Sequence, residues 1–195
     1  LTSTDTGATR QALSDDNGYY IFTNLRIGNY EIRAELDGFQ PVRITGIKLS
    51  AGEVLNFPLV MTASDVTTAV ELRAKVGQVE MSTSQLDTVI DEKRILDLPL
   101  NGRDPLDLIY LTPGVVRGQT GYPSASGGRE RGNNYQIDGI DNNYTQTIGY
   151  TVDINVDATS EFLVVTSNPS AEYGRADGAI IDVVTKSGTN EFHGA

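Results

Sequence analysis

The sequence predicts a mainly β chain, in which a small antiparallel β-sandwich is followed by a mixed α/β unit. Through about residue 62, short runs of alternating apolar and polar residues are separated by turn signals at intervals of about 8 to 12 residues, a pattern typical of sandwich strands. From residue 87, helix-capping residues and longer apolar runs replace this pattern. The sequence therefore predicts a sandwich over 1–62, a linker over 63–86 and a second unit over 87–195.

The strands of the first unit are predicted from turns and from alternation. Asn17 and Gly18 lie in a turn between strands 9–13 and 19–22, because both residue types tolerate the positive φ of a tight hairpin. Apolar residues then occupy alternate positions over 30–36 and 55–61, with a further strand opening at 42–47. Five or six such strands make a small sandwich with one buried face on each sheet.

The segment 63–86 is rich in Ser, Thr and Val and has no strong core signal. Its short β-prone stretch, Ala69, Val70, Glu71 and Leu72, could pair with the sheet edge of another chain. An ordinary linker strand explains the same residues.

The elements of the second unit are predicted from capping residues and apolar runs. Asp91 can cap a helix that buries Ile95 and Leu98, and Asp104, followed by Pro105, can cap a second helix through residue 111. The Gly/Ser/Arg-rich segment 118–134 is expected to be a mobile loop. Strands are predicted at 135–137, 162–166 and 179–184, with a helical turn at 157 before the second of them.

Composition excludes several classes of function. The net charge of −11 argues against nucleic acid or an anionic membrane surface as a partner. The chain has no Cys and a single His, His193, which argues against thiolate metal sites and His-based catalytic triads. No nucleotide-binding glycine motif or G-x-S-x-G motif is present. We therefore predict a protein that is not an enzyme and has no cofactor and no metal.

The second unit resembles the plug domain of TonB-dependent outer-membrane transporters. Several stretches occur in the order of that family: Val-Ile-Asp at 89–91, Leu-Pro-Leu-Asn-Gly-Arg at 98–103, Leu-Thr-Pro-Gly-Val at 111–115, the Arg-Gly to Asp-Gly run at 131–139, and the block 170–188. The resemblance implies that the plug motif comprises Arg131, Gly132, Asp138, Gly139, Tyr173, Gly174, Arg175 and Lys186.

The first unit resembles the carboxypeptidase-regulatory-like domain, a transthyretin-like sandwich with an immunoglobulin-like layout. The match is carried by the stretches 16–20, 24–30 and 37–39. Domains of this kind usually begin one or two strands earlier, so the sandwich is expected to lack its first strand, and no barrel is expected in this chain. Together the two units are similar to the N-terminal part of Oar-type receptors.

This resemblance implies a plug and periplasmic region that gates energised uptake of a ligand at the bacterial outer membrane, on its periplasmic side. Ala69, Val70, Glu71 and Leu72 lie where the family carries its TonB-box-like strand. The implied partners are a TonB-type energy-transducing protein, which would take this strand by β-strand addition, and the barrel of the same receptor.

A second hypothesis is a self-assembling structural protein that forms extracellular filaments by strand donation between copies. The sandwich would accept a strand, and the donor would be Ala179, Ile180, Ile181, Val183 and Val184, or the linker strand 66–72. Head-to-tail donation does not close on itself and so gives a filament.

Several residue sets have a functional and an ordinary explanation. The turn at Tyr173, Gly174 and Arg175 could contact a barrel or be a structural turn, and Arg129 and Arg131 could bind an anion or be solvated. Two oxygen-rich sets could be Ca²⁺ ligands or ordinary turn formers: Asp138, Asp141, Asn142 and Asn143, and Asp15, Asp16 and Asn17. Five tyrosines could stack on sugars or be core aromatics: Tyr19, Tyr20, Tyr30, Tyr135 and Tyr150.

Overall fold

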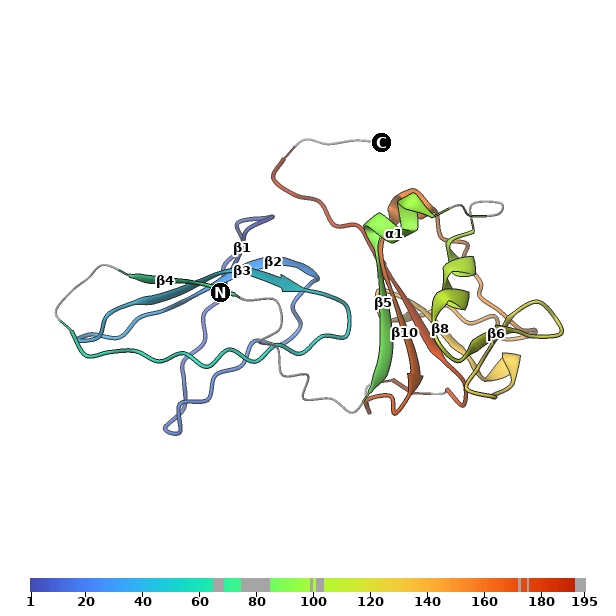
Figure 1. Cartoon of the computed structure of the whole chain (residues 1–195), viewed down its shortest axis with the longest axis horizontal. Helices are drawn as coiled ribbons and strands as arrows, with labels where there is room; N and C mark the ends of the chain where they lie inside the picture. Colours follow the sequence, from blue (N-terminus) through green and yellow to red (C-terminus); the bar gives the residue numbers. More distant parts are fainter. Residues whose placement is uncertain are drawn as a thin grey trace. The chain divides into compact units, whose positions relative to one another are not determined.

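The chain forms two compact units, which are described separately. One comprises Leu1–Ser82 with Gly188–Gly194 and the other Thr83–Ser187 (Figure 1). The computed structural model describes residues 1–64, 69–74, 85–98, 100, 104–171, 173–174 and 176–191. Among the residues singled out above, Arg175, His193, residues 66–68 and most of the 98–103 motif lie outside the described residues. The predicted boundaries 1–62, 63–86 and 87–195 stay a prediction.

The first unit contains a four-stranded sheet. Its strands are β1 (Thr2–Ser3), β2 (Gly28–Ala34), β3 (Val42–Leu49) and β4 (Val70–Arg73), in the order β1-β2-β3-β4. The pairs β1–β2 and β2–β3 are antiparallel, whereas β4 runs parallel to β3. The prediction of a mainly β chain is confirmed, and the strand pairs within the predicted sandwich are antiparallel. β4 comes from the predicted linker and adds a parallel strand, because it returns to the sheet through a long connection rather than a hairpin.

The core of the first unit lies on one face of this sheet. Its buried members are Tyr30, Ile32, Ile44 and Ile47, and Leu25, Leu49, Leu55, Phe57 and Leu59 pack against them. The predicted alternation is therefore confirmed for Tyr30 and Ile32 and for the segment 55–59, whereas Leu36 is 60% exposed.

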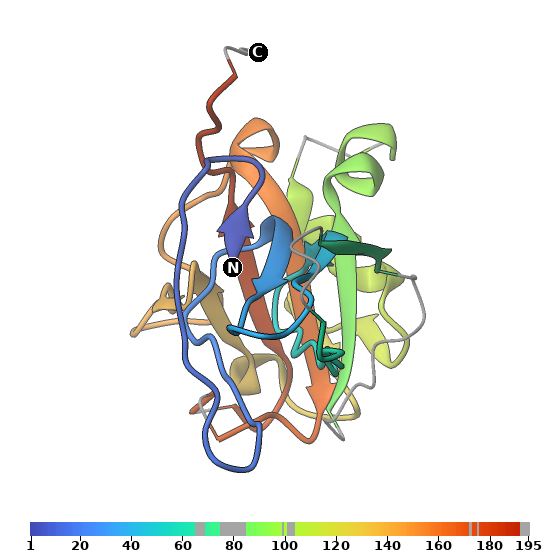
Figure 2. The same ribbon diagram turned by 90° about the vertical axis from the view of Figure 1, so that its left-hand side faces the viewer.

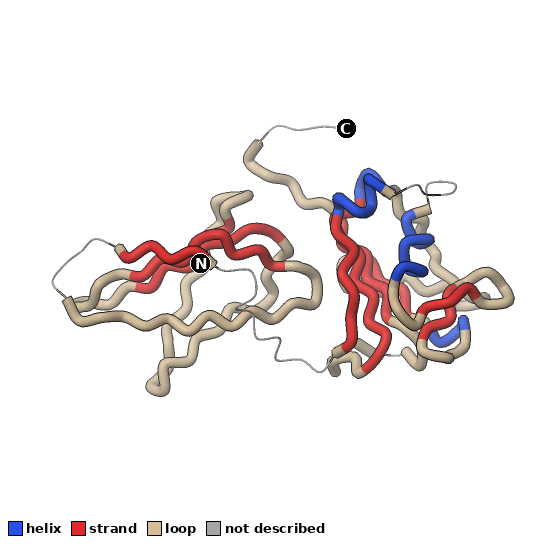
Figure 3. Tube along the Cα trace, viewed as in Figure 1, coloured by secondary structure: helices blue, strands red, loops and turns tan. Residues whose placement is uncertain are grey.

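The second layer of the first unit consists of extended segments without strand pairing. Over residues 53–61 partly buried and exposed side chains alternate, so that Leu55 faces the core while Val54 and Val60 are exposed, yet the segment is drawn as loop (Figure 3). The connection between β1 and β2 is also loop (Figure 2), and the Tyr20 hydroxyl donates to the Phe57 carbonyl at 2.5 Å. The predicted strands at 9–13, 19–22 and 55–61 are wrong as strands, because a strand also needs a neighbouring backbone at ladder distance.

The second unit is built on a five-stranded sheet of order β5-β10-β11-β8-β9. Its strands are β5 (Leu86–Asp91), β8 (Asn134–Ile137), β9 (Ile140–Asp141), β10 (Thr159–Ser167) and β11 (Ile180–Thr185). Only β11 and β8 pair in parallel among these described strands. β10 carries the apolar run 162–165 and β11 is apolar at Ile180, Ile181, Val183 and Val184; both strands are mostly buried, as expected for the centre of a sheet.

Short helices cover one face of this sheet. α1 (Glu92–Asp97) is capped by Asp91, whose Oδ1 accepts from the Arg94 N–H at 2.9 Å. The 3-10 helix η2 (Pro105–Leu111) is capped in the same way by Asp104. Both predicted helix starts are confirmed, although Leu98 is the C-cap of α1 and is 36% exposed rather than inside.

The core of the second unit fills the space between these helices and the sheet. The buried side chains of Phe162, Val164, Ile181 and Val183 come from the two central strands. Ile95 from α1 and Leu108 and Ile109 from η2 pack against them. None of the helices in the described ranges is long and apolar enough to span a membrane.

The segment 118–134 forms defined elements where its composition predicted a mobile loop. β6 (Val115–Arg117) and β7 (Pro123–Ala125) form a separate antiparallel pair, followed by η3 (Glu130–Gly132). A further 3-10 turn, η4 (Val156–Ala158), precedes β10. Glycine-rich composition alone did not reveal the strand at 123–125 or the 3-10 turn at 130–132, whereas residues 118–122 and 126–129 are turns and loop.

Candidate functional site

The candidate partner strand is β4, at an edge of the first sheet. Ala69 precedes it, and Val70, Glu71 and Leu72 pair in register with residues 42–44 of β3. All four residues of β4 are exposed, with Val70 39% and Leu72 48% accessible. The Val70 N–H donates to the Pro41 carbonyl at 2.8 Å. Backbone bonds, rather than side-chain burial, therefore hold β4 on the sheet.

The outer edge of β4 carries backbone groups that face away from β3. The N–H groups of Val70 and Ala74 both point to β3, since they donate to Pro41 and Thr45. Successive residues of a strand direct these groups to opposite edges, so those of Glu71 and Arg73 point outward. In the described part of the first sheet no strand lies beyond β4. Such an edge is a template for an added strand.

A glycine contact joins two parts of the candidate plug motif. The Gly132 carbonyl accepts from the N–H groups of Asp177 and Gly178, at 3.1 and 2.9 Å. A side chain at Gly178 would meet the Asn133 Oδ1 at 2.5 Å and backbone atoms of residues 132 and 133 at 3.1–3.2 Å. Glycine is thus required here because two backbones approach closely. The motif residue Gly132 has a structural role at this contact.

Asn133 completes the contact and was not predicted as a site residue. Its Nδ2 donates to the Pro123 carbonyl at 2.6 Å and, more weakly, to the Glu130 carbonyl at 3.4 Å. Its Oδ1 accepts from the Ala179 N–H at 2.9 Å, and the side chain is 7% exposed. One buried amide therefore ties together β7, η3 and the start of β11. Its position beside Gly132 is the only sequence signal that could have pointed to it.

The turn at Asp138 and Gly139 is fastened to the end of β11. Both residues have positive φ, 51° and 76°. The Asp138 carboxylate accepts from the Thr185 N–H at 2.9 Å and from its hydroxyl at 2.7 Å. The Gly139 N–H donates to Asp182 Oδ1 at 3.1 Å. Burial raises the pKa of Asp182, against the opposing effect of this bond, and the charge of Asp138 raises it further.

The remaining motif residues lie in separate places. The Gly174 carbonyl accepts from Asn134 Nδ2 at 2.8 Å, and the Tyr173 N–H donates to Ser170. Lys186 forms an ion pair with Glu92 of α1 at 2.8 Å. Arg131 is exposed in η3. The structure thus brings Gly132, Gly174 and the 177–179 segment to the start of β8, and Asp138 and Gly139 to its end.

The candidate donor strand is in the middle of the second sheet. Ile180, Ile181, Val183 and Val184 belong to β11, and Ala179 directly precedes it. β11 pairs with β10 on one side and with β8 on the other. Both of its edges are occupied, so donating this strand to another copy would require breaking the sheet. This arrangement does not fit the role of a donor.

The oxygen-rich residues around the turn are used in local hydrogen bonds. Asp141 Oδ1 accepts from the Asn143 N–H at 2.8 Å, and Asn142 exchanges two bonds with Val152. In the first unit Asp15 Oδ1 accepts from the N–H groups of residues 17 and 19. Within the described ranges, no three or more His, Cys, Asp or Glu side chains are grouped to hold a metal. These bonds are those of ordinary turn formers.

Two tyrosines of the second unit pack as core aromatics. The rings of Tyr135 and Tyr150 lie 5.7 Å apart at 58°, and Tyr135 is 4% exposed. Its hydroxyl is buried without a hydrogen-bond partner among the described residues. Burial raises the pKa of Tyr135 to about 12.

Tyr135 is expected to weaken the fold at alkaline pH. Because the folded pKa lies above the ordinary value of 10.0, stability is retained below that value and declines as pH rises toward the folded pKa. Replacing Tyr135 with phenylalanine is expected to leave neutral-pH stability unchanged or raise it by up to about 1 kcal/mol, since no bond is lost. The variant should also show a shallower decline in urea midpoint between about pH 10 and 12. Parallel declines in the two proteins would contradict this account.

Comparison with known proteins gives a family match in the first unit and a curated relative that matches the whole chain. Residues 1–62 match the carboxypeptidase regulatory-like domain family. The TonB-dependent transporter Oar of Myxococcus xanthus is 24% identical over 202 residues, which cover 100% of this chain and 19% of that protein. The chain therefore spans about a fifth of the length of this relative.

Solved structures of outer-membrane receptors match about half of the chain. The alcaligin outer-membrane receptor FauA of Bordetella pertussis is 21% identical with a TM-score of 0.49, covering 58% of this chain and 20% of the receptor. The ferric-catecholate import receptor Fiu of E. coli is 24% identical with a TM-score of 0.45, covering 56% and 15%. With its carboxypeptidase regulatory-like match over residues 1–62 and its similarity to Oar over the whole chain, this protein resembles the N-terminal region of a TonB-dependent outer-membrane receptor of the Oar type.

Proposed function

We propose that this chain is the plug and periplasmic N-terminal region of a TonB-dependent outer-membrane receptor that gates energised uptake of a ligand. Its similarity to Oar over 100% of the chain supports this function. The observation that carries the mechanism is the exposed edge strand β4, which precedes the plug-like unit. In this proposal the chain works at the outer membrane, on the periplasmic side, with the barrel of the same receptor around residues 87–195.

The energy-transducing partner would bind Ala69, Val70, Glu71 and Leu72 as an added strand. Backbone hydrogen bonds would supply the affinity, which suits a stretch whose side chains are exposed and not distinctive. The protein that would bind the strand in this way is a TonB-type energy-transducing protein. The outward N–H groups of Glu71 and Arg73 are the donors available to it before any rearrangement.

Pulling on the partner strand would act next on β5. This strand is the following described element of the chain and lies at an edge of the five-stranded sheet. It pairs with β10 alone, so a single row of backbone bonds holds it there. Removing an edge strand leaves β10, β11 and β8 paired with one another. The topology therefore supports a plug that opens by losing β5 rather than by unfolding.

Proline at position 71 is expected to weaken binding of the purified C-terminal domain of the cognate TonB protein at least about ten-fold. Proline removes the outward N–H of Glu71, whereas the inward bonds of Val70 and Ala74 to β3 remain. Binding would be measured by isothermal titration calorimetry on the 195-residue chain.

Two controls separate the backbone effect from other causes. Glu71→Gln removes the charge but keeps the N–H, and Val60→Pro places proline at an exposed extended position outside any strand. Both should bind like the unmodified chain. Equal binding by Glu71→Pro, or no binding by the unmodified chain, would overturn the proposed role of this strand.

We do not propose the filament alternative. The comparisons give transporters and receptors, and the candidate donor β11 is paired along both edges.

A further inference from the structure

We propose that the first unit carries a docking site for a segment from the far end of the chain. The site is the turn after β1, residues 4–7, and its occupant is the segment 189–191, which binds through Asn190. This inference goes beyond the function proposed above, because it concerns how the chain binds to itself and involves neither β4 nor a TonB-type partner.

Two hydrogen bonds join Asn190 to successive carbonyl groups of this turn. The Asn190 N–H donates to the Asp5 carbonyl at 3.1 Å, and Asn190 Nδ2 donates to the Thr6 carbonyl at 2.7 Å. A Cβ added at Gly7 would lie 3.5 Å from the same Nδ2, which is an ordinary contact distance, so the amide lies against the turn. A residue without a side-chain donor at position 190 could make only the first of the two bonds.

The turn is held in shape by its own hydrogen bonds. The Ser3 N–H donates to the Ala8 carbonyl at 2.8 Å, and the Gly7 N–H donates to the Ser3 carbonyl at 2.9 Å. Gly7 has a φ of 72°, a conformation that residues with a side chain rarely adopt. The carbonyl groups of residues 5 and 6 are therefore fixed in direction by the turn itself.

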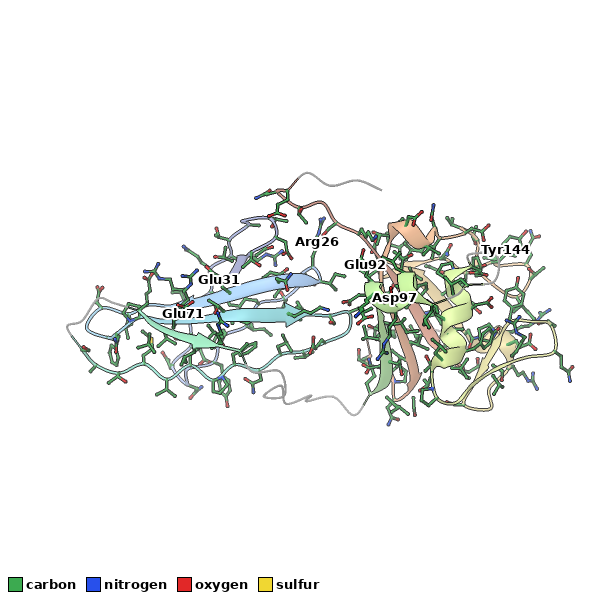
Figure 4. All side chains as sticks on the ribbon, turned by 45° about the horizontal axis from the view of Figure 1, so that its top comes forward. Arg26, Glu31, Glu71, Glu92, Asp97 and Tyr144 are labelled. Atoms are coloured by element: carbon green, nitrogen blue, oxygen red, sulfur yellow. The ribbon has the colours of Figure 1, made fainter. Side chains whose placement is uncertain are left out.

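Asp5 fastens this turn to the start of β2. Its Oδ2 accepts from the Asn29 N–H at 2.8 Å and its Oδ1 from Asn29 Nδ2 at 3.1 Å, while the Thr4 N–H donates to the Asn29 carbonyl at 2.9 Å. Figure 4 labels Arg26 on the loop before β2, where the Arg26 carbonyl accepts from the Tyr30 hydroxyl at 2.7 Å. The site is thus tied to a sheet strand, which lowers the entropic cost of binding.

The occupant is also partly ordered by a local bond. The Thr189 hydroxyl accepts from the Glu191 N–H at 3.2 Å, which closes a short turn with Asn190 between the two residues. All three residues are exposed. Because the contact consists of two exposed hydrogen bonds, we expect it to be weak and reversible.

Docking gives the chain a second passage between its two units. Gly188–Gly194 belongs to the first unit although it follows Ser187 of the second, so the chain passes between the units at 82–83 and again at 187–188. With the segment 189–191 released, only the passage at 82–83 would restrict the first unit. The docked state would therefore limit the motion of the first unit, and the released state would free it.

Amide signals of the isotope-labelled 195-residue chain in nuclear magnetic resonance spectra test the docking. Asn190→Ala removes the bond to Thr6, and Asn190→Asp replaces the donor by an acceptor of nearly the same shape. In both variants the amide nitrogen signals of Thr6 and Gly7 are expected to move by more than their line width, because each follows a carbonyl that loses a donor. Protection of the residue-190 N–H against hydrogen exchange should fall about two- to ten-fold.

Asn56 provides the matched control, since it is an exposed asparagine of the same unit in the extended segment 53–61. Asn56→Ala and Asn56→Asp should leave the signals of residues 6 and 7 and the protection of residue 190 unchanged. Unchanged signals in both Asn190 variants would overturn the docking, and so would equal changes in the Asn56 variants. No partner is added in this experiment, so its result and that of the TonB binding experiment can fail separately.

Discussion

Replacing Asn133 with alanine is expected to lower the free energy of unfolding of the second unit by about 3 kcal/mol. The substitution removes the bonds to the Pro123 and Glu130 carbonyls and leaves the Ala179 N–H without its acceptor. Because the side chain is 7% exposed, water does not readily replace these partners. The measurement is urea unfolding of the full chain followed by circular dichroism.

The matched control for Asn133 is an exposed amide in the same unit. Gln119 is exposed and follows β6, so Gln119→Ala should change stability by less than about 0.5 kcal/mol. A loss of similar size in both variants would show that the Asn133 bonds do not stabilise the unit.

The second large effect is expected at Gly178. Alanine there is predicted to destabilise the second unit by about 2–3 kcal/mol. Its Cβ would meet Asn133 Oδ1 at 2.5 Å, the Gly132 carbonyl carbon at 3.1 Å and the Asn133 backbone nitrogen at 3.2 Å. Two of these three atoms belong to backbone, so the contact cannot be relieved by a side-chain rotation.

A glycine of the same unit serves as the control for Gly178. Gly174→Ala would meet nothing within 4 Å. It should be nearly neutral in the urea experiment. The double variant Asn133→Ala/Gly178→Ala should lose less than the sum of the single losses, because Oδ1 is the closest obstacle to the new methyl group. Strict additivity would contradict the proposed steric contact.

The helices of the second unit could be predicted from sequence because their signals are local. Asp91 and Asp104 each accept from an N–H two or three residues later, so the cap and its partner are in one short window. The strands β10 and β11 could be predicted for a similar reason, since each contains a short, mainly apolar run, which is a local signal of a buried strand.

The candidate site could be predicted only in part. Gly132, Asp138 and Gly139 were identified as motif residues, but their partners were not, because Asp177, Thr185 and Asp182 are far along the chain. Asn133 carries the largest predicted effect and was missed. An asparagine beside a glycine has the same appearance in a sequence whether it is exposed or buried.

The partner strand shows the same division. The β-prone character of Val70, Glu71 and Leu72 could be identified from the sequence. Their parallel pairing with β3 could not, because no pattern in either segment indicates which strand it pairs with. Conversely, 55–61 has the alternation of a strand and faces the core as predicted, yet it is not paired. Side-chain alternation indicates which face of an extended segment is buried. It does not indicate whether the segment forms backbone hydrogen bonds with a neighbouring strand.

The sequence by itself determined the mainly β character of this protein, the starts of α1 and η2, the central strands and most of the side chains that face each core. These follow from capping and periodicity, which act within a few residues. Only the tertiary structure decided that β4 is held on β3, that β11 is closed on both edges, and that Asn133 joins three elements. Those outcomes depend on groups brought together from distant parts of the chain. Which of these groups form hydrogen bonds with one another depends on their positions in the fold rather than on residue type.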